Sequence, residues 1–127
     1  MSWKQDAIGI LETHNARKQS LVSMSLAMER LAMEPHYPKT QDQKMERLVA
    51  EHSLQQSYRQ TALLVQRTQC ALEVLTPAEQ QVLEMLYIYP KRGNCNILLC
   101  LQGICKSTLY RRRDLALQKF TVALYGS

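Results

Sequence analysis

Apolar residues recur at intervals of three and four along the first quarter of this chain. Such intervals place side chains on one face of an α-helix. No proline interrupts residues 2–33, and Ser2 with Gln5 forms the S-x-x-Q pattern of a capping box at the start. The pattern predicts one helix from about Ser2 to Met33. Its stripe consists of Trp3, Ala7, Ile10, His14, Arg17, Leu21, Met24, Met28 and Leu31.

A second long helix is predicted from Thr40 to about Leu75. Residues 34–39 separate it from the first, because each of their two prolines disfavours a helical residue before it. Thr40 and Gln43 repeat the capping pattern, and the helix would be about 50 Å long at 1.5 Å per residue. Its stripe consists of Leu54, Tyr58, Thr61, Val65, Thr68, Leu72 and Leu75, with Met45, Leu48 and Val49 nearer the start.

Two helices of this length in residues 1–75 indicate either a long helical hairpin or an oligomeric coiled coil. The stripes are also compatible with the packing seam of a monomeric bundle. A short head over residues 76–127 offers little core to cover helices of this length. We therefore expect residues 1–75 to carry oligomerisation, with a homodimer as the simplest assembly.

Three shorter helices are predicted in residues 76–127. The first begins at a capping box, Thr76 to Glu79, with proline at the first helical position, and ends before Pro90 and Gly93. Its apolar face consists of Val82, Leu83, Leu86 and Tyr87. A short helix from about Asn94 to Leu101 follows, with Ile97, Leu98 and Leu101 as buried candidates. After a turn at residues 102–105, the last helix runs from about Lys106 to Leu124.

A short apolar helix, a glycine turn and a cationic helix are typical of a helix-turn-helix. Gly103 suits the left-handed conformation of the turn, Ile104 would fill the angle between the helices, and Leu109 would face the core. The outward face then carries Lys106, Ser107, Tyr110, Arg111 and Asp114, with Arg112 and Arg113 beside it. A helix fits the major groove of DNA, where arginine reads guanine or binds phosphate.

The distribution of charge agrees with an anionic partner for this half. The chain has a formal net charge of +5 and a pI near 9.2. Residues 76–127 hold seven Lys or Arg against three Asp or Glu, whereas residues 1–75 hold nine against eight. We therefore predict binding of double-stranded DNA. The candidate DNA-binding residues are Lys91, Arg92, Lys106, Ser107, Thr108, Tyr110, Arg111, Arg112 and Arg113.

Composition narrows the remaining classes of fold and function. Four Gly and four Pro leave too few turns for an all-β fold, so the chain is predicted to be all-α. The longest apolar run, Ile97 to Leu101, is too short to span a membrane, and the N-terminus lacks a signal peptide, so we expect a cytoplasmic protein. Phosphate-loop, metalloprotease and nucleophile-elbow motifs are absent, so neither an enzyme nor a cofactor is expected. Cys70, Cys95, Cys100 and Cys105 lack zinc-site spacing and are expected to be reduced and free of metal.

Two C-terminal segments, LTPAEQQVLEMLYI and NILLCLQGICKSTLYRRRDLALQKF, resemble the sigma-factor domain that binds the promoter −35 element. The whole chain is similar to the ArpU/RinA-type regulators of temperate phages of Gram-positive bacteria. Those proteins have an N-terminal helical region, a proline-containing break, here EPHYPKTQDQKMERLV, a second long helix and a sigma-like helix-turn-helix. The C-terminal likeness covers about fifty residues, and the likeness over residues 1–75 is one of layout.

The resemblance implies a transcription activator of phage late genes, acting in the bacterial host cytoplasm and helping to recruit RNA polymerase. Carried over by position, it implies DNA contacts from Lys106, Ser107, Tyr110 and Arg111. The chain departs from the family pattern at three positions. The cap of the recognition helix is Cys105 in place of serine, Leu99 replaces a small residue, and Gln102 replaces the leucine before the glycine.

Two other functions remain open from the sequence. One is a phage DNA-packaging subunit of the small-terminase kind, which would assemble into a ring of many copies. The other is an adaptor that binds RNA polymerase or a sigma factor through its helices without reading DNA. Neutralising the arginines would leave the activity of such an adaptor intact.

Overall fold

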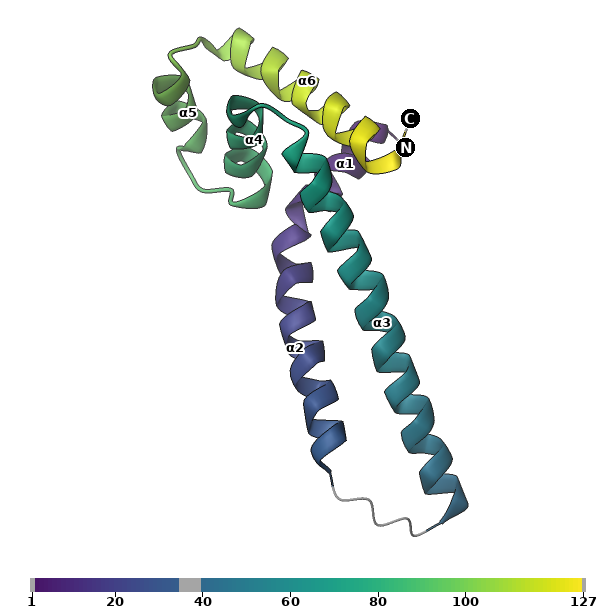
Figure 1. Ribbon diagram of the computed structural model, residues 1–127. Coiled ribbons are helices and arrows are strands. Elements are labelled where there is room, and N and C mark those ends of the chain that lie inside the picture. Colours follow the sequence, from purple (N-terminus) through teal and green to yellow (C-terminus); the bar gives the residue numbers. More distant parts are fainter. Residues whose placement is uncertain (1, 35–39, 127) are drawn as a thin grey trace. The chain divides into compact units, whose positions relative to one another are not determined.

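The computed structural model describes residues 2–34 and 40–126, and over these ranges it contains helices and no strand (Figure 1). The all-α prediction is confirmed. Of the predicted break at 34–39, residues 35–39 lie outside the described part of the chain. The elements are α1 (Trp3–Glu12), α2 (His14–Met33), α3 (Gln41–Glu73), α4 (Pro77–Leu83), the π-helical turn η1 (Glu84–Ile88), α5 (Asn94–Gln102) and α6 (Lys106–Tyr125).

The chain divides into two compact units. Unit 1 comprises Met1–Asn15 and Gln66–Ser127, and unit 2 comprises Ala16–Val65. The sequence placed the boundary at residue 75 instead. The difference arises because α1 and the end of α3 contribute buried side chains to the same core as α6. The DNA-binding half predicted from the sequence is therefore part of a larger unit that includes α1 and the end of α3.

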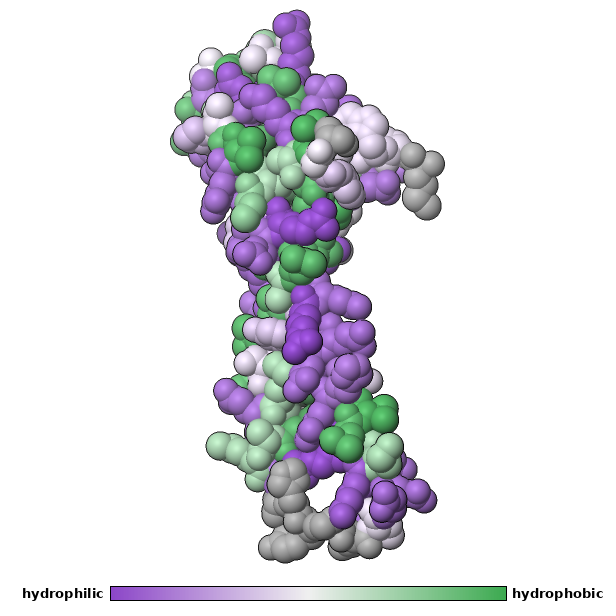
Figure 2. Space-filling model, turned by 45° about the vertical axis from the view of Figure 1, so that its right-hand side comes forward, coloured by the Kyte–Doolittle hydropathy of each residue, from purple (hydrophilic) through white to green (hydrophobic). Residues whose placement is uncertain are grey.

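Unit 2 has almost no buried interior of its own. Among its described residues only Val65 is buried, while the predicted stripe residues Leu54, Tyr58 and Thr61 are half-buried. Arg47 of α3 donates a hydrogen bond to the carbonyl of Leu31 on α2 and forms an ion pair with Glu51 at 3.1 Å. Figure 2 shows hydrophobic surface among hydrophilic residues on the lower part of the view, which these two helices form. None of the helices described is both long and apolar enough to cross a lipid bilayer.

The first helix predicted from the sequence is in fact two helices. Thr13 ends α1 with a backbone φ of −97° and ψ of 1°, and its hydroxyl donates to the carbonyl of Gly9 at 2.7 Å. A threonine that bonds back in this way bends a helix, and glycine four residues earlier offers little resistance. At the start of α1, the Ser2 hydroxyl accepts from the amide of Lys4 at 3.2 Å, two residues on, whereas a capping box uses the third residue.

The main core of unit 1 lies between α1, the end of α3, α4, η1 and α6. Phe120 of α6 is fully buried in it, and burying such a side chain contributes about 1.5–3 kcal/mol. On α1 the buried residues are Ala7 and Leu11, while Trp3 is 44% exposed, so the predicted stripe was wrong at its start. The cluster consists of Ala7, Leu11, Ala71, Leu75, Leu83, Ile88, Ala116, Leu117, Phe120 and Leu124.

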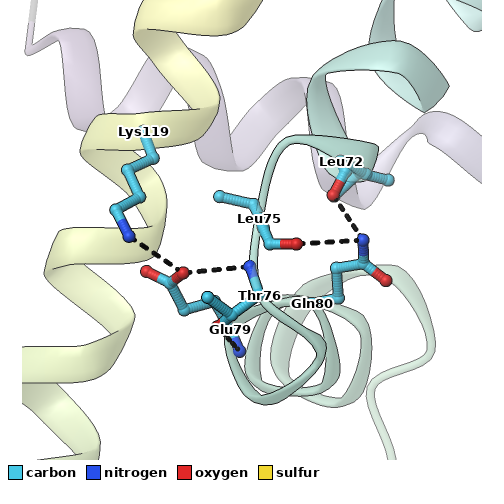
Figure 3. A network of polar contacts seen from close by, with 6 residues as sticks. All are labelled: Leu72, Leu75, Thr76, Glu79, Gln80 and Lys119. Atoms are coloured by element: carbon cyan, nitrogen blue, oxygen red, sulfur yellow. Dashed lines mark hydrogen bonds and ion pairs between the residues drawn. The ribbon is translucent and has the colours of Figure 1, made fainter.

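The capping box predicted at the start of α4 is confirmed and is also a joint between helices (Figure 3). The Thr76 hydroxyl accepts from the amide of Glu79 at 3.3 Å, and a carboxylate oxygen of Glu79 accepts from the Thr76 amide at 3.1 Å. That oxygen also accepts from the ammonium of Lys119 on α6 at 3.1 Å. Gln80 donates to the carbonyl of Leu72 at 2.7 Å, so the turn between α3 and α4 is fixed on both sides.

Burial would raise the pKa of Glu79, but the hydrogen bonds that its carboxylate receives outweigh this effect. The bonds from the amide and hydroxyl of Thr76 and from Lys119 lower the pKa of Glu79 below its ordinary value. The side chain of Glu79 is 5% exposed, so a charge is held in the interior by donors from two helices.

The sequence did not predict the π-helical turn that follows α4. At η1 the amide of Tyr89 donates to the carbonyl of Glu84 at 2.7 Å, a spacing of five residues. The side chain of the buried Asn94 donates to the carbonyls of Met85 at 2.7 Å and Tyr89 at 3.0 Å. Asn94 therefore binds the widened turn to the start of α5.

Candidate nucleic-acid interface

The turn between α5 and α6 has the geometry that the sequence predicted. Gly103 adopts the left-handed conformation, with φ 61° and ψ 39°. The amide of Ile104 donates to the carbonyl of Leu99 at 3.2 Å, which is the 6→1 bond of a Schellman motif. A side chain at position 103 would be strained in this conformation, so glycine fixes the point where α5 ends.

A second buried cluster holds α5 and α6 at their angle. Val82 of α4, Leu98 of α5 and Leu109 of α6 are all fully buried, and Ile104 packs against them from the turn. Leu109 therefore faces the core and Ile104 fills the angle, as predicted. Because Leu109 fixes the rotation of α6, the residues on the opposite side of its first turns face solvent.

The inner face of α5 differs from the prediction. Leu98 is buried, but Ile97 is 48% exposed and Leu101 is 62% exposed. The half-buried apolar side chains beside Leu98 are Cys95 and Leu99. The helix also ends one residue later than predicted, at Gln102, whose polar side chain takes the inward position that Leu101 was expected to occupy.

Most of the predicted DNA-binding residues are exposed. Lys106, Ser107, Tyr110 and Arg111 are exposed on the first turns of α6. Lys91 and Arg92 are exposed in the loop between η1 and α5, while Thr108 is half-buried.

Arg112 lies on another side of α6 and bonds within the protein. Its guanidinium donates to the side-chain oxygen of Gln102. The amide nitrogen of Gln102 donates in turn to the carbonyl of Ala78 at 3.0 Å and to the side chain of Gln81 at 3.1 Å. Arg112 thus stabilises the helix-turn-helix, and its contact with DNA stays a prediction.

Arg113 also has partners within unit 1. Its guanidinium carbon lies 5.0 Å from the centre of the Tyr110 ring, a cation–π arrangement. The same guanidinium donates to a carboxylate oxygen of Asp114 from two nitrogens, at 3.1 and 3.2 Å. Lys4 of α1 forms an ion pair with that oxygen at 3.1 Å.

The surface carries positive charge because a long interval of the sequence contains no acidic residue. Between Glu84 and Asp114 the sequence contains six Lys or Arg and no Asp or Glu. The interval covers the loop before α5, all of α5, the turn and the first turns of α6. A surface of one sign attracts phosphate over a distance of about 10 Å at ordinary salt.

Cys105 is the N-cap of α6, and its backbone is extended with φ −90° and ψ 168°. The hydroxyl oxygens of Ser107 and Thr108 lie 3.2 and 3.3 Å from its sulfur. These contacts, led by that of Ser107 and supported by backbone amides, lower the pKa of Cys105 to about 6. A thiolate at this position is a better hydrogen-bond acceptor for a helix start than a neutral thiol.

All four cysteines have free thiols. Within residues 2–34 and 40–126, no three His, Cys, Asp or Glu side chains are placed to hold a metal ion.

Sequence reasoning missed the roles of Lys4 and Gln102. Lys4 is 110 positions before Asp114 in the sequence, and no local pattern joins them. Gln102 did carry a signal, because a polar residue stands where an apolar one is usual in the resembling family. Comparisons with protein-family models, with curated proteins and with solved structures find no match, so the interpretation of this surface depends on its geometry and charge.

Proposed function

We propose that this chain is a sequence-specific DNA-binding transcription regulator that inserts the start of α6 into the major groove. The observation that carries the proposal is the orientation of α6. Leu109 is fully buried, so Lys106, Tyr110 and Arg111 are presented together at the end of a left-handed glycine turn. A recognition helix reads base edges with residues of its first turns in this way.

The exposed residues suit different parts of a DNA duplex. Arg111 can form paired hydrogen bonds with guanine, and Tyr110 can contact a neighbouring base edge. Lys91, Arg92 and Lys106 supply charge for phosphates, which position the protein without reading sequence. The likeness to ArpU/RinA-type regulators supports the activation of phage late genes as the biological role.

A homodimer completes the proposal, because unit 2 exposes apolar residues that a second copy would cover. On α2 these residues follow one stripe, Val22, Leu26 and Met33, at spacings of four and seven. On α3, Met45, Leu48 and Val49 form a second group. All six have more than half of their surface exposed.

The size of these surfaces supports a second copy of this chain as the partner. Six side chains of these types, each more than half exposed, together offer an apolar area on the order of several hundred Å². A stable dimer buries about 800 Å² per partner, so both groups and their polar surroundings would be needed. The two helix-turn-helix regions of a dimer would bind paired half-sites that lie about one helical turn of DNA, or a multiple of it, apart.

The direct test of DNA binding is to sequence the genomic DNA fragments that the purified full-length protein retains at moderate salt. We expect one enriched motif, and affinity for it should fall steeply with added salt, by a slope of about 0.9 per phosphate contact. Arg111→Ala should weaken binding to that motif by about 1–3 kcal/mol. The matched control is Arg59→Ala, an exposed arginine of α3, which should leave binding unchanged. Retention without enrichment, or equal effects of both variants, would contradict the proposal.

One observation favours the adaptor as a second candidate. A groove of about 660 Å³ in unit 1 is lined mostly by apolar side chains, among them Trp3, Val74, Leu115 and Val122. An apolar groove of this kind suits a protein partner such as RNA polymerase. If the protein binds polymerase and Arg111→Ala leaves this binding and transcription unchanged, the adaptor is the better description.

A further inference from the structure

A continuous set of contacts joins the N-terminal helix to the proposed reading face. Lys4 of α1 bonds to Asp114, Asp114 bonds to Arg113, and Arg113 lies over the ring of Tyr110. The distances from Asp114 to Lys4 and to Arg113 are both 3.1 Å, and they share the same carboxylate oxygen. Three of these four residues lie on α6 within five positions.

The position of Lys4 is fixed by the core rather than by the surface. Ala7 and Leu11, one and two turns further along α1, are fully buried in the cluster that contains Phe120 of α6. The core therefore holds α1 against α6, and Lys4 reaches Asp114 from a rigid element. The contact does not depend on a flexible loop.

Asp114 is at first sight an unfavourable residue for this surface. It ends the interval without acids, and a lone carboxylate there would repel the phosphates that the neighbouring arginines attract. With Lys4 on one side and Arg113 on the other, its charge is offset by two cations. What remains is an acceptor that, together with the side chain of Tyr87, determines where the Arg113 guanidinium lies.

The guanidinium in turn restricts the Tyr110 ring. A cation over one face of the ring is attracted to it and leaves the other face and the hydroxyl for DNA. Restricting a reading side chain before binding lowers the entropy lost on binding, and it improves discrimination because a ring held in one orientation cannot adjust to the wrong base.

We propose that Asp114 is a positioning residue for DNA specificity, which holds Arg113 and through it orients Tyr110, with Lys4 as its anchor. The proposal rests on the proposed DNA-binding function. It assigns Arg113 a role within the reading face rather than at a phosphate alone.

The experiment compares Asp114→Asn, Lys4→Met and the control Lys44→Met in the full-length protein. Lys44 is exposed on α3 in unit 2, and Lys44→Met changes the net charge of the protein by the same amount as Lys4→Met. Affinity is measured for the enriched motif and for single-base variants, and Tyr110→Ala identifies the base pair whose discrimination depends on Tyr110. We expect Asp114→Asn and Lys4→Met to lower the discrimination at that base pair about two- to fivefold, the range of a partly exposed ion pair, and Lys44→Met to leave it unchanged.

The opposite outcome has a distinct signature. If Asp114 only repels phosphate, Asp114→Asn will tighten binding to all sequences alike and leave the discrimination unchanged, which overturns the proposal. Asp114→Glu should restore part of the discrimination if the carboxylate positions Arg113.

A second measurement needs no DNA. The proton resonances of the Tyr110 ring should shift in Asp114→Asn and in Lys4→Met and stay in place in Lys44→Met, and unchanged resonances in all three contradict the positioning role. If the wild-type protein enriches no motif, the proposed function fails independently of this result.

Discussion

Arg112 of α6 donates a hydrogen bond to the side-chain oxygen of Gln102, the last residue of α5. Gln102 uses its nitrogen for the carbonyl of Ala78 and the side chain of Gln81 on α4. One amide group therefore connects the two helices of the helix-turn-helix, α5 and α6, to α4. The resembling family usually has leucine before this glycine, so a polar contact replaces an apolar one at the angle between the helices.

The contact predicts a stabilising role for Gln102. Gln102→Leu removes the amide nitrogen that donates to Ala78 and Gln81. It also removes the oxygen that accepts from the half-buried guanidinium of Arg112. We expect the free energy of unfolding to fall by about 1 kcal/mol, measured by urea denaturation. Gln69→Leu, at an exposed position of α3, is the control and should change it much less. Equal losses in the two variants would show that Gln102 does not act through these bonds.

The helix-turn-helix could be predicted from the sequence because its signals are local. Gly103, Ile104 and Leu109 lie within seven residues, and each conformation follows from the residue type at that position. The capping box at Thr76 and Glu79 was predictable for the same reason. The break at Thr13 was not, because it depends on a hydroxyl bonding back to Gly9, and threonine occurs in unbroken helices as well.

Glu79 predicts a pH dependence of stability. The pKa of Glu79 is lowered in the folded protein, so its contribution is fully present above the ordinary value near 4.5 and is lost as the pH falls through the folded value. Glu79→Gln should reduce the free energy of unfolding by about 1 kcal/mol at pH 7 and make the loss between pH 5 and pH 3 smaller. Chemical denaturation at several pH values measures both effects. The exposed Glu84→Gln serves as the control, and parallel pH profiles of wild type and Glu79→Gln would refute this role.

Cys105 predicts an unusually reactive thiol. With a pKa of about 6, Cys105 should be mostly thiolate at pH 7, and alkylation by iodoacetamide should reach half of its maximal rate near pH 6. The measurement uses a chain in which Cys70, Cys95 and Cys100 are replaced by serine. Because the Ser107 hydroxyl is the largest cause of the lowered pKa, Ser107→Ala should move the midpoint to higher pH. An unchanged midpoint would exclude the hydroxyl as the cause.

The candidate interface could be predicted only in part, because helical spacing places some of its residues and contacts with other helices place the rest. Lys106, Tyr110 and Arg111 follow from helical spacing relative to Leu109, and spacing can be read from the sequence. The partners of Arg112 and Arg113 cannot be read in this way. Both arginines lie in the same run of three as Arg111. Arg112 bonds to Gln102 of α5, whereas Arg113 bonds to Asp114, which Lys4 of α1 also contacts.

The dimer is the prediction with the widest consequence, and the structure changes how it should be tested. A fragment beginning near Leu75 would lose Ala7, Leu11 and Ala71 from the core of unit 1, so it would report on folding rather than on assembly. A charge on the exposed stripe of α2 in the full-length chain is a cleaner change. Leu26 is 56% exposed, so Leu26→Glu should leave the monomer folded while opposing a partner.

We expect light scattering at micromolar concentration to give the mass of a dimer for the wild type and of a monomer for Leu26→Glu. Gln60→Glu adds the same charge at an exposed position of α3 outside both apolar groups and should remain dimeric. Leu26→Glu should also bind the enriched motif much more weakly, because the second head no longer acts at a high effective concentration. A monomeric wild type would refute the dimer and leave the apolar groups of unit 2 to another protein. A mass of many subunits would instead favour the ring of a packaging component.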